Sequence, residues 1–387
     1  MAYNINQLLQ NESGRIGPDI FDKSLNTSPW LKLVQRDTWP DEMGQTIQVL
    51  TYERSLPGTT PTWSTVDYTT GTGAGSCVPA SEEVGFASTL RSYNLQQSAL
   101  ESPPICVNDL RFSVMRREQL RSCFDVLQQN TRWMWQERYR DEFVRLAEHK
   151  VIVRAGFPES DSAFPSQTPT SKLTQGTLDR FYLKLLRDGG GNNAVDRVNG
   201  RPQFIAIMGP ETQEALLKEI GDIRDDFRYS DRVGDLLGPL GVTRPYKGFF
   251  HLIDDFPPRY NWDGTNWVKV EPYTSSAASK GTKYDINPAW ETATYEDTII
   301  FHPDVYTSMV PKPITTPGGN TKFDAVKYMG DWKWLNEFDR TENPDKTIGY
   351  FRGVFSNGSK PVHPEYGYVL RHLRCAPELN LGACAAT

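Results

Sequence analysis

The sequence lacks the common signatures of catalytic and metal sites. Its five cysteines are far apart and include no CxxC pair, so neither a zinc ribbon nor a dithiol motif is predicted. Its five histidines show no HExxH spacing, and no GxSxG nucleophile elbow occurs. We therefore predict a protein that is not an enzyme, with no cofactor and no bound metal.

Long apolar runs and strong charge of either sign are also missing. No stretch of eighteen apolar residues occurs, so no segment is predicted to span a membrane. The first fifteen residues have neither a basic start nor an apolar core, which excludes a secretory signal peptide. The net charge of −6 is small and acidic, which argues against a protein that wraps nucleic acid.

Lysine is absent between Lys32 and Lys150. An amine nucleophile requires lysine, because arginine stays charged at any working pH. No side chain between these two lysines can therefore supply the amine that an amide cross-link requires.

What the chain does contain is one long helical pattern, predicted over 108–150. Apolar residues recur along one face, where Thr131 fills a gap, and polar residues such as Gln136 and Arg140 occupy other faces. Neither proline nor glycine occurs between Arg111 and Lys150, and Asn108 is a suitable N-cap. The apolar residues of this face are Leu120, Phe124, Leu127, Met134, Tyr139, Phe143 and Leu146. Such a helix would span roughly 60 Å, either buried along a large domain or serving as a spine for other parts or copies.

Two strands are predicted before this helix, at 46–53 and 86–95. Between them, Ser55 to Ser81 contains seven Thr, four Ser, four Gly and three Pro, with Asp67 as the only charge. This composition indicates either a long two-stranded loop that projects from the body or a disordered linker. Residues 1–45 are predicted to form an extended arm, with a short helical cap as the alternative.

The sequence after the long helix alternates between strand and helix patterns, which indicates a mixed α/β unit. Strands are predicted at 151–153, 204–208, 248–254 and 298–302, helices at 174–187 and 211–220, and a short helix between Asp304 and Pro311. Residues 260–296 are predicted to be an insertion, and aromatic-rich strands follow to the end of the chain.

Three groups of residues have a chemical interpretation that we weigh against a structural one. Gly189, Gly190 and Gly191 lack the Lys-Ser or Lys-Thr of a phosphate loop, so a turn is favoured. Asp254 and Asp255 would suit a carbohydrate-active enzyme, but a turn rich in Asp and Pro is favoured. The arginines of the long helix could touch nucleic acid, yet the interleaved Asp and Glu favour a salt-bridged face.

The order of these parts resembles the major capsid proteins of tailed bacteriophages, the Hong Kong 97-like fold family. Local phrases are similar as well: RPQFIAIMGPETQEALLKEI resembles a strand and helix of the axial domain, and RPYKGFFHLIDDFP the strand and turn that often follow. DTIIFHPDVYTSMVP and KPVHPEYGYVLRHLRC resemble late segments of such proteins.

This resemblance implies an α+β fold of five parts. They are an N-terminal arm at 1–45, an extended loop at 46–104, a peripheral domain with a spine helix at 105–172, an axial domain at 173–332 that includes the insertion at 260–296, and closing strands at 333–387.

The resemblance also implies a structural protein that self-assembles into an icosahedral shell enclosing double-stranded DNA. The implied partners are copies of the chain in hexamers and pentamers, a separate scaffolding protein, a portal, a cement or decoration protein, and DNA through weak non-specific contact. The implied location is the virion, after assembly in the host cytoplasm. An encapsulin-like compartment and, less favoured, a soluble carbohydrate-active enzyme stay open as alternatives.

Contacts between subunits are predicted at the arm, the extended loop and the spine helix. The candidates are Trp30, Trp63, Tyr68, Arg116, Arg117, Arg121, Arg132 and Arg140. Some members of the family join a loop lysine to an asparagine of the next subunit, with a glutamate assisting. Because the extended loop of this chain has no lysine, we predict that its shell is not cross-linked in this way.

Overall fold

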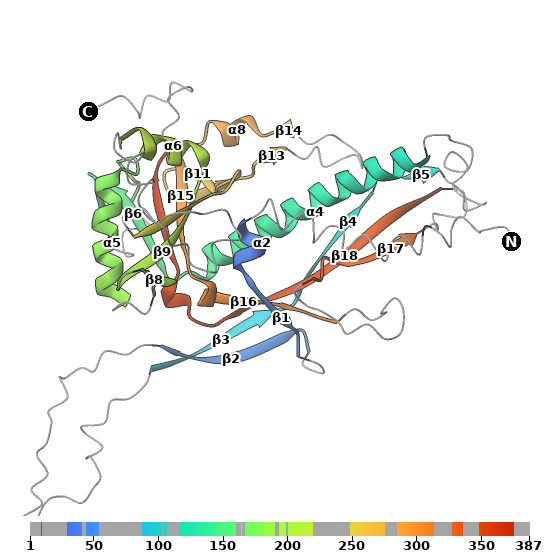
Figure 1. The fold of residues 1–387 in the computed structure, drawn as a ribbon, viewed down its shortest axis with the longest axis horizontal. Helices are drawn as coiled ribbons and strands as arrows, with labels where there is room; N and C mark the ends of the chain where they lie inside the picture. The colour runs from blue at the N-terminus through green and yellow to red at the C-terminus, as the bar shows by residue number, and fades with distance from the viewer. Residues whose placement is uncertain are drawn as a thin grey trace, which may run out of the picture.

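The computed structural model describes residues 9, 29–40, 44–53, 87–102, 104–106, 116–159, 164, 167–189, 193–198, 200–219, 248–274, 285–312, 327–335 and 348–374. Within these ranges the chain combines one long helix, several shorter helices and two large sheets, which confirms the predicted α+β class (Figure 1). No helix in the described ranges is long and apolar enough to cross a membrane.

The long helix, α4, runs from Arg116 to Leu146, and the predicted end at Lys150 is wrong. The amide of Ala147 still bonds the carbonyl of Phe143, but His149 and Lys150 already belong to strand β6, His149–Arg154. β6 pairs in parallel with β19, Tyr368–Leu373, and this pairing takes the two residues out of the helix. The predicted start at Asn108 lies outside the described residues.

The larger sheet has the order β10-β9-β15-β19-β6-β7 among the described strands. In addition, β8 pairs with β9, β11 pairs with β15, and β12 pairs with β11. The bounds of the strands not yet given are β7 Phe157–Glu159, β8 Asp196–Val198, β9 Arg201–Met208, β10 Phe249–Ile253, β11 Arg259–Trp262, β12 Trp267–Val270 and β15 Tyr295–Phe301. The strands predicted at 151–153, 204–208, 248–254 and 298–302 are thus confirmed within a few residues.

Alternation along β9 explains how this sheet holds the molecule together. Phe204 and Ala206 face a core that includes Phe181 of α5, Gln175–Gly189, whereas Ile205 and Ile207 face a second core that includes Phe143 of α4. Successive side chains of a strand point to opposite faces, so one buried strand serves both cores. The sheet therefore lies between α5 on one face and α4 on the other, and α6, Pro210–Glu219, packs beside β10 and β9 (Figure 1).

The second sheet is built around β18, Ile348–Pro361. It has the order β1-β16-β18-β17, and β4 and β5 also pair with β18. The other bounds are β1 Gln35–Thr38, β4 Gln96–Glu101, β5 Ile105–Cys106, β16 Tyr306–Val310 and β17 Asp331–Leu335. β18 runs alongside α4 for much of the length of the helix (Figure 1).

One local prediction needs correction, and one strand was not predicted. The short helix expected before Pro311 is only a 3-10 turn, Pro303–Val305, followed by strand β16. The β-branched and apolar residues of YTSMV suit a strand, and β16 gains partners on both sides, β1 in parallel and β18 antiparallel. The strand expected at 86–95 is confirmed as β3, Ala87–Asn94, but the strand that follows it after Leu95, β4, was not predicted.

The region predicted as an insertion starts within the larger sheet. Arg259 of β11 pairs with Glu296 of β15, and β11 turns back antiparallel as β12. Beyond it lie β13 Tyr273–Thr274, β14 Asp285–Ile286 and the short helix α8, Pro288–Glu291. The boundaries of the five parts given by the resemblance stay predictions.

Candidate assembly surface

A two-stranded ribbon extends away from both sheets. β2, Thr46–Glu53, pairs antiparallel with β3 over eight residues, from Thr46 opposite Asn94 to Glu53 opposite Ala87 (Figure 1). This confirms the strand predicted at 46–53. Residues 54–86, which include the predicted contact residues Trp63 and Tyr68, lie outside the described part of the chain.

The inner face of the ribbon is fixed to the body at its root. Ile47 and Tyr93 stand opposite each other and are buried with Trp39 and Met309. The rings of Trp39 and Tyr93 meet edge-to-face at 5.4 Å between centroids. Burial raises the pKa of the Tyr93 hydroxyl above its ordinary value. The root of the ribbon is therefore held to the body by a small buried apolar cluster.

A glycine and an ion pair complete this attachment. A Cβ added at Gly358 would lie 2.3 Å from Cζ3 of Trp39, so only glycine lets the indole pack against β18. Arg91, on the inner face of β3, lies 3.7 Å from the Glu148 carboxylate just beyond the end of α4. The direction of the ribbon is thus set by contacts within the chain.

The outer face of the ribbon carries an apolar pair with nothing over it in the described structure. Leu50 and Leu90 stand directly opposite each other, and their exposed fractions are 48% and 62%. Gln48 and Ser92, the neighbouring pair on the same face, are exposed too. Cross-strand side chains lie about 5 Å apart, so the two leucines form one apolar spot.

The part of the arm around Trp30 packs into the body of the subunit. Trp30, in the short helix α2, Pro29–Leu33, has no exposed area and packs against Phe143 and Phe301. Its indole nitrogen donates to the Asp254 carboxylate at 2.9 Å. Trp30 is therefore buried within the single chain, and a contact of this side chain with another subunit stays a prediction.

The same carboxylate gathers two polar side chains of α4. Gln136 donates to Asp254 at 2.6 Å, and the Arg140 guanidinium lies 3.8 Å from it and also donates to the carbonyl of Phe256. Both side chains are buried, so α4 is enclosed on a polar flank as well as on its apolar face. Asp254 is therefore a buried structural group, and the role of the buried Arg140 between subunits stays a prediction.

Of the remaining arginine candidates, one is partly exposed and three have side chains that the structure does not describe. Arg132 is partly exposed, and one of its nitrogens lies 3.5 Å from Asp255, so its role between subunits stays a prediction. Arg116, Arg117 and Arg121 belong to the first turns of α4, but their side chains lie outside what the structure describes. In the described part of α4, Glu142 accepts from Arg145 at 2.7 Å and lies 3.9 Å from Arg138, which confirms the predicted salt-bridged face.

A cluster of charges joins α4 to β12. Lys269 lies 2.6 Å from Asp141, 3.1 Å from Glu271 and 3.4 Å from Glu137. Burial, aided by a hydrogen bond with Glu271, raises the pKa of Glu137 to about 7. No group of three or more metal-ligating side chains occurs among the described residues. The buried His372 shares a hydrogen bond with the Thr298 hydroxyl.

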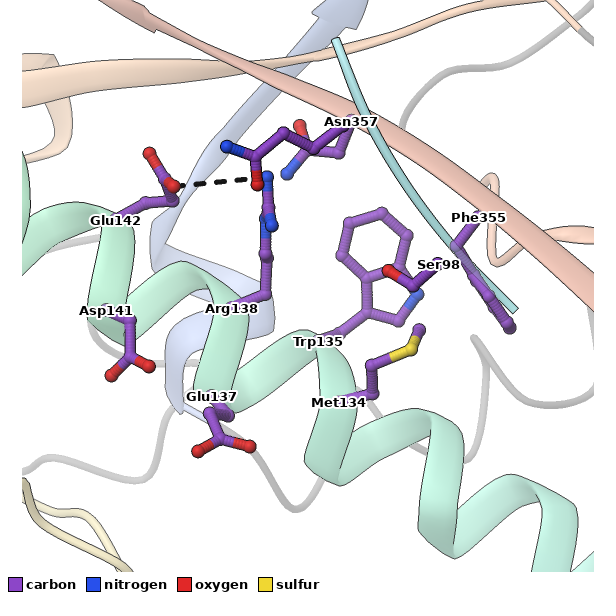
Figure 2. Close-up of a pocket in the computed structure, with 10 residues that line it drawn as sticks. Ser98, Met134, Trp135, Glu137, Arg138, Asp141, Glu142, Phe355 and Asn357 are labelled. Carbon is purple, nitrogen blue, oxygen red and sulfur yellow. Dashed lines mark ion pairs between the residues drawn. The ribbon is translucent and has the colours of Figure 1, made fainter. Parts of the chain in front are cut away.

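A groove lies between α4 and the face of the second sheet that looks toward this helix. Its volume is about 250 Å³. Figure 2 shows Trp135, Arg138 and Glu142 directed from α4 toward the strands, while Glu137 and Asp141 point to another side of the helix. The residues lining it are Gln96, Ser98, Met134, Trp135, Glu137, Arg138, Asp141, Glu142, Phe355 and Asn357.

Sequence reasoning missed Trp135, Gln136 and Asp254 as organising residues. Trp135 is buried, yet it is not among the regularly spaced apolar residues from which the apolar face of the long helix was predicted. A signal for Asp254 was present, because a carboxylate at the end of a buried strand needs a donor. It accepts locally from the amide of Phe256 at 3.1 Å, but the indole and amide side chains that donate to it lie 224 and 118 residues away, which no local pattern shows.

No family model matches the sequence, and no curated protein is similar to it. Solved structures resemble its fold over most of its length. A capsid structure of the cyanophage P-SCSP1u is 12% identical, with a TM-score of 0.48 over 90% of this chain and 89% of that one. The capsid of Ralstonia phage GP4 is 11% identical, with a TM-score of 0.48 over 89% and 88% of the two chains.

An encapsulin complex from Synechococcus elongatus is also similar, with 9% identity and a TM-score of 0.46 over 89% of this chain and 87% of that one. At such identities and TM-scores the likeness concerns fold alone, and it assigns no partner or cargo to this chain.

Proposed function

We propose that this chain is the major capsid protein of a tailed bacteriophage, and that its copies assemble into an icosahedral shell around double-stranded DNA. The observation that carries the proposal is the β2–β3 ribbon. Its root is fixed by Trp39 and Tyr93, and its outer face presents Leu50 and Leu90 away from both cores. A rigid ribbon with an exposed apolar pair contributes little to its own core, but it gives a neighbouring copy something to bury.

The charge distribution supports a shell whose wall holds DNA weakly. The net charge of the sequence is −6, and arginines of α4 such as Arg138 and Arg145 are paired with Glu142. Tight binding of phosphates needs unpaired basic side chains. In the proposal the other partners are a separate scaffolding protein, a portal and a cement or decoration protein, and assembly takes place in the host cytoplasm.

The test replaces the apolar pair and leaves the ribbon in place. The double variant Leu50→Ser, Leu90→Ser should keep the circular dichroism spectrum and melting temperature of the single chain, since both side chains are exposed. It should lose most large particles in sucrose-gradient sedimentation. The matched control Gln48→Ala changes the same face without removing apolar area and should assemble normally.

Two outcomes would count against the proposal. Equal particle yields from the double variant and the control would show that the ribbon face makes no contact. Particles that enclose protein cargo and no nucleic acid, as judged by their ratio of absorbance at 260 and 280 nm, would favour an encapsulin-like compartment instead.

A further inference from the structure

Three crossings of the chain between the two large sheets meet at one junction. β15 passes into β16 through the 3-10 turn η3, Pro303–Val305, and β18 passes into β19 through a second 3-10 turn, η4, Pro364–Tyr366. The third crossing is the end of α4, which leads into β6. Any change in the angle between the two sheets must therefore bend the chain at this junction.

Backbone hydrogen bonds join the three crossings to one another. The amide of His363 donates to the Asp304 carbonyl at 2.8 Å, which ties η4 to η3. The amide of Glu148, just beyond α4, donates to the Pro364 carbonyl at 3.1 Å, which ties the end of the helix to η4. The junction is therefore rigid only while both 3-10 turns keep their positions.

A histidine side chain caps η3. Nδ1 of His302 accepts a hydrogen bond from the amide of Asp304 at 3.2 Å. A backbone amide can only donate, so Nδ1 must hold a free lone pair and the imidazole is neutral in this arrangement. The ring is buried, and it also has a hydrogen bond with the backbone of Ala194, just before β8. The cap of η3 thus depends on the protonation state of a single imidazole.

The same turn holds a second partner for a charged ring. The Asp304 carboxylate lies 3.9 Å from Nδ1 of His302, and this aspartate side chain is 48% exposed. A proton on Nδ1 would point at the donating amide, which cannot accept it, whereas the carboxylate can. His302 therefore has two alternative partners on one residue, the amide when the ring is neutral and the carboxylate when it is charged.

The turn η4 contributes the other titratable groups that face this ring. Tyr366 lies edge-to-face with His302 and stacks on His363, each at 5.0 Å between ring centroids. Nδ1 of His363 lies 2.9 Å from the Glu365 carboxylate. A positive charge on His363 opposes one on His302, whereas the carboxylates of both turns favour it. Burial is the largest effect and lowers the pKa of His302 below its ordinary value of 6.5, so the ring is neutral at neutral pH.

We propose that His302 is a pH-sensitive switch in a hinge between the two sheets. The neutral ring caps η3 and packs on Tyr366, which keeps the two turns together. The protonated ring turns from the Asp304 amide to the Asp304 carboxylate, so η3 loses its cap and its contact with η4 weakens. The two sheets are then joined less rigidly in acid than at neutral pH. The switch belongs to the single folded subunit, so it goes beyond the proposed function and does not depend on assembly.

The test measures hydrogen–deuterium exchange of dissociated, folded subunits at pH 8 and pH 5, corrected for the intrinsic exchange rate at each pH. Protection of the amides in the segments 303–306 and 362–367 should be about three- to tenfold lower at pH 5, the range expected for one lost cap. The amides of β9 are the control for unfolding of the whole subunit and should keep their protection. The buried His251 does not interfere, because pH 5 lies above its pKa of about 4.

Three variants assign the effect to His302. His302→Asn supplies an oxygen that can accept from the Asp304 amide but does not titrate, so protection should be the same at both pH values. Asp304→Asn removes the alternative partner of the charged ring and should move the loss of protection to lower pH; its exposed side chain makes normal folding the expected result. His363→Asn is the matched control, because it removes the other histidine of the junction and should keep the pH-dependent loss.

The inference is overturned by wild-type protection that is equal at pH 8 and pH 5, by a loss that persists in His302→Asn, or by a loss that disappears in His363→Asn instead. An equal loss in β9 would mean that the whole subunit unfolds, and it would overturn the inference too. If His302→Asn does not fold, Asp304→Asn decides, and an unchanged transition pH in that variant would contradict the switch.

Discussion

The indole nitrogen of Trp30 donates a hydrogen bond to the carboxylate of Asp254 at 2.9 Å, although 224 residues separate them in sequence. Gln136 and Arg140 of α4 converge on the same carboxylate. One buried charge therefore joins the arm, the long helix and the end of β10. The described part of the arm around Trp30 is thus packed within the subunit.

Removing this carboxylate should destabilise the subunit strongly. Asp254→Ala leaves the buried Arg140 guanidinium with less compensation and two side-chain donors unpaired, those of Trp30 and Gln136, which should cost about 3–5 kcal/mol of unfolding free energy. Asp255→Ala is the matched control, because the Asp255 side chain is 61% exposed and contacts Arg132 alone at 3.5 Å, so about 0–1 kcal/mol is expected. Urea denaturation of dissociated subunits measures both, and equal losses would contradict the structural role of Asp254.

Stability should fall with rising pH through the titration of Glu137. Its pKa is raised from 4.5 to about 7 by burial and by the hydrogen bond with Glu271, so the folded chain holds the proton more tightly than the unfolded chain does. This contribution is present below pH 4.5, declines as the pH rises to about 7, and stays lost above that. The side chain is 39% exposed and partly screened, which limits the effect to about 1 kcal/mol.

The variant Glu137→Gln isolates this effect from other titrating groups. His251 acts in the opposite direction, because burial lowers its pKa to about 4 and its contribution grows as the pH rises from 4 to 6.5. The difference in unfolding free energy between wild type and Glu137→Gln, measured by urea titration at pH 5 and pH 8, should therefore shift by about 1 kcal/mol in favour of the variant at pH 8. No change in that difference would show that Glu137 ionises normally.

The root of the ribbon should tolerate no side chain at Gly358. In Gly358→Ala the new Cβ would lie 2.3 Å from the Trp39 ring, so the indole must move and loosen its contact with Tyr93. Overpacking of this kind costs about 1–3 kcal/mol, and particle yield should fall because the ribbon loses its direction. Gly44→Ala, with no atom within 4 Å of the new Cβ, should behave as wild type. Normal assembly of Gly358→Ala would mean that the root does not orient the ribbon.

The absence of lysine between Lys32 and Lys150 predicts a shell held together without covalent links through the extended loop. Particles boiled in detergent with reductant should give a single band near the monomer mass of 43.9 kDa. A ladder of bands that survives reductant would contradict this prediction, and mass spectrometry of those bands would identify the residues joined.

Most of the regular structure was predictable because it follows from local periodicity. The buried strand at Phe204 to Met208 and the apolar face of α5, with Phe181 and Leu185, are encoded by neighbouring residues. The end of α4 was not, because His149 is drawn into β6 by pairing with a strand more than 200 residues later. At this position the pairing of β6 with β19 outweighs the helix propensity of the local sequence, which contains no sign of that pairing.

The candidate surface was predictable only in outline. The ribbon strands follow from alternation in TIQVLTYE, but which face is buried depends on Trp39 and Met309, which come from other parts of the chain. Trp30 and Arg140, two of the predicted contact residues, are buried within the subunit by residues distant in sequence. A bulky or charged side chain thus indicates an interface only when the fold leaves it exposed.

The most direct measurement of the central proposal is negative-stain electron microscopy of the purified chain, expressed alone and together with a scaffolding protein. If the chain is a capsid protein, closed and roughly spherical particles of uniform size should form in at least one of these preparations. They should disappear in the Leu50→Ser, Leu90→Ser variant. A chain that stays a folded monomer or small oligomer in both preparations, at every concentration tried, would contradict the proposal.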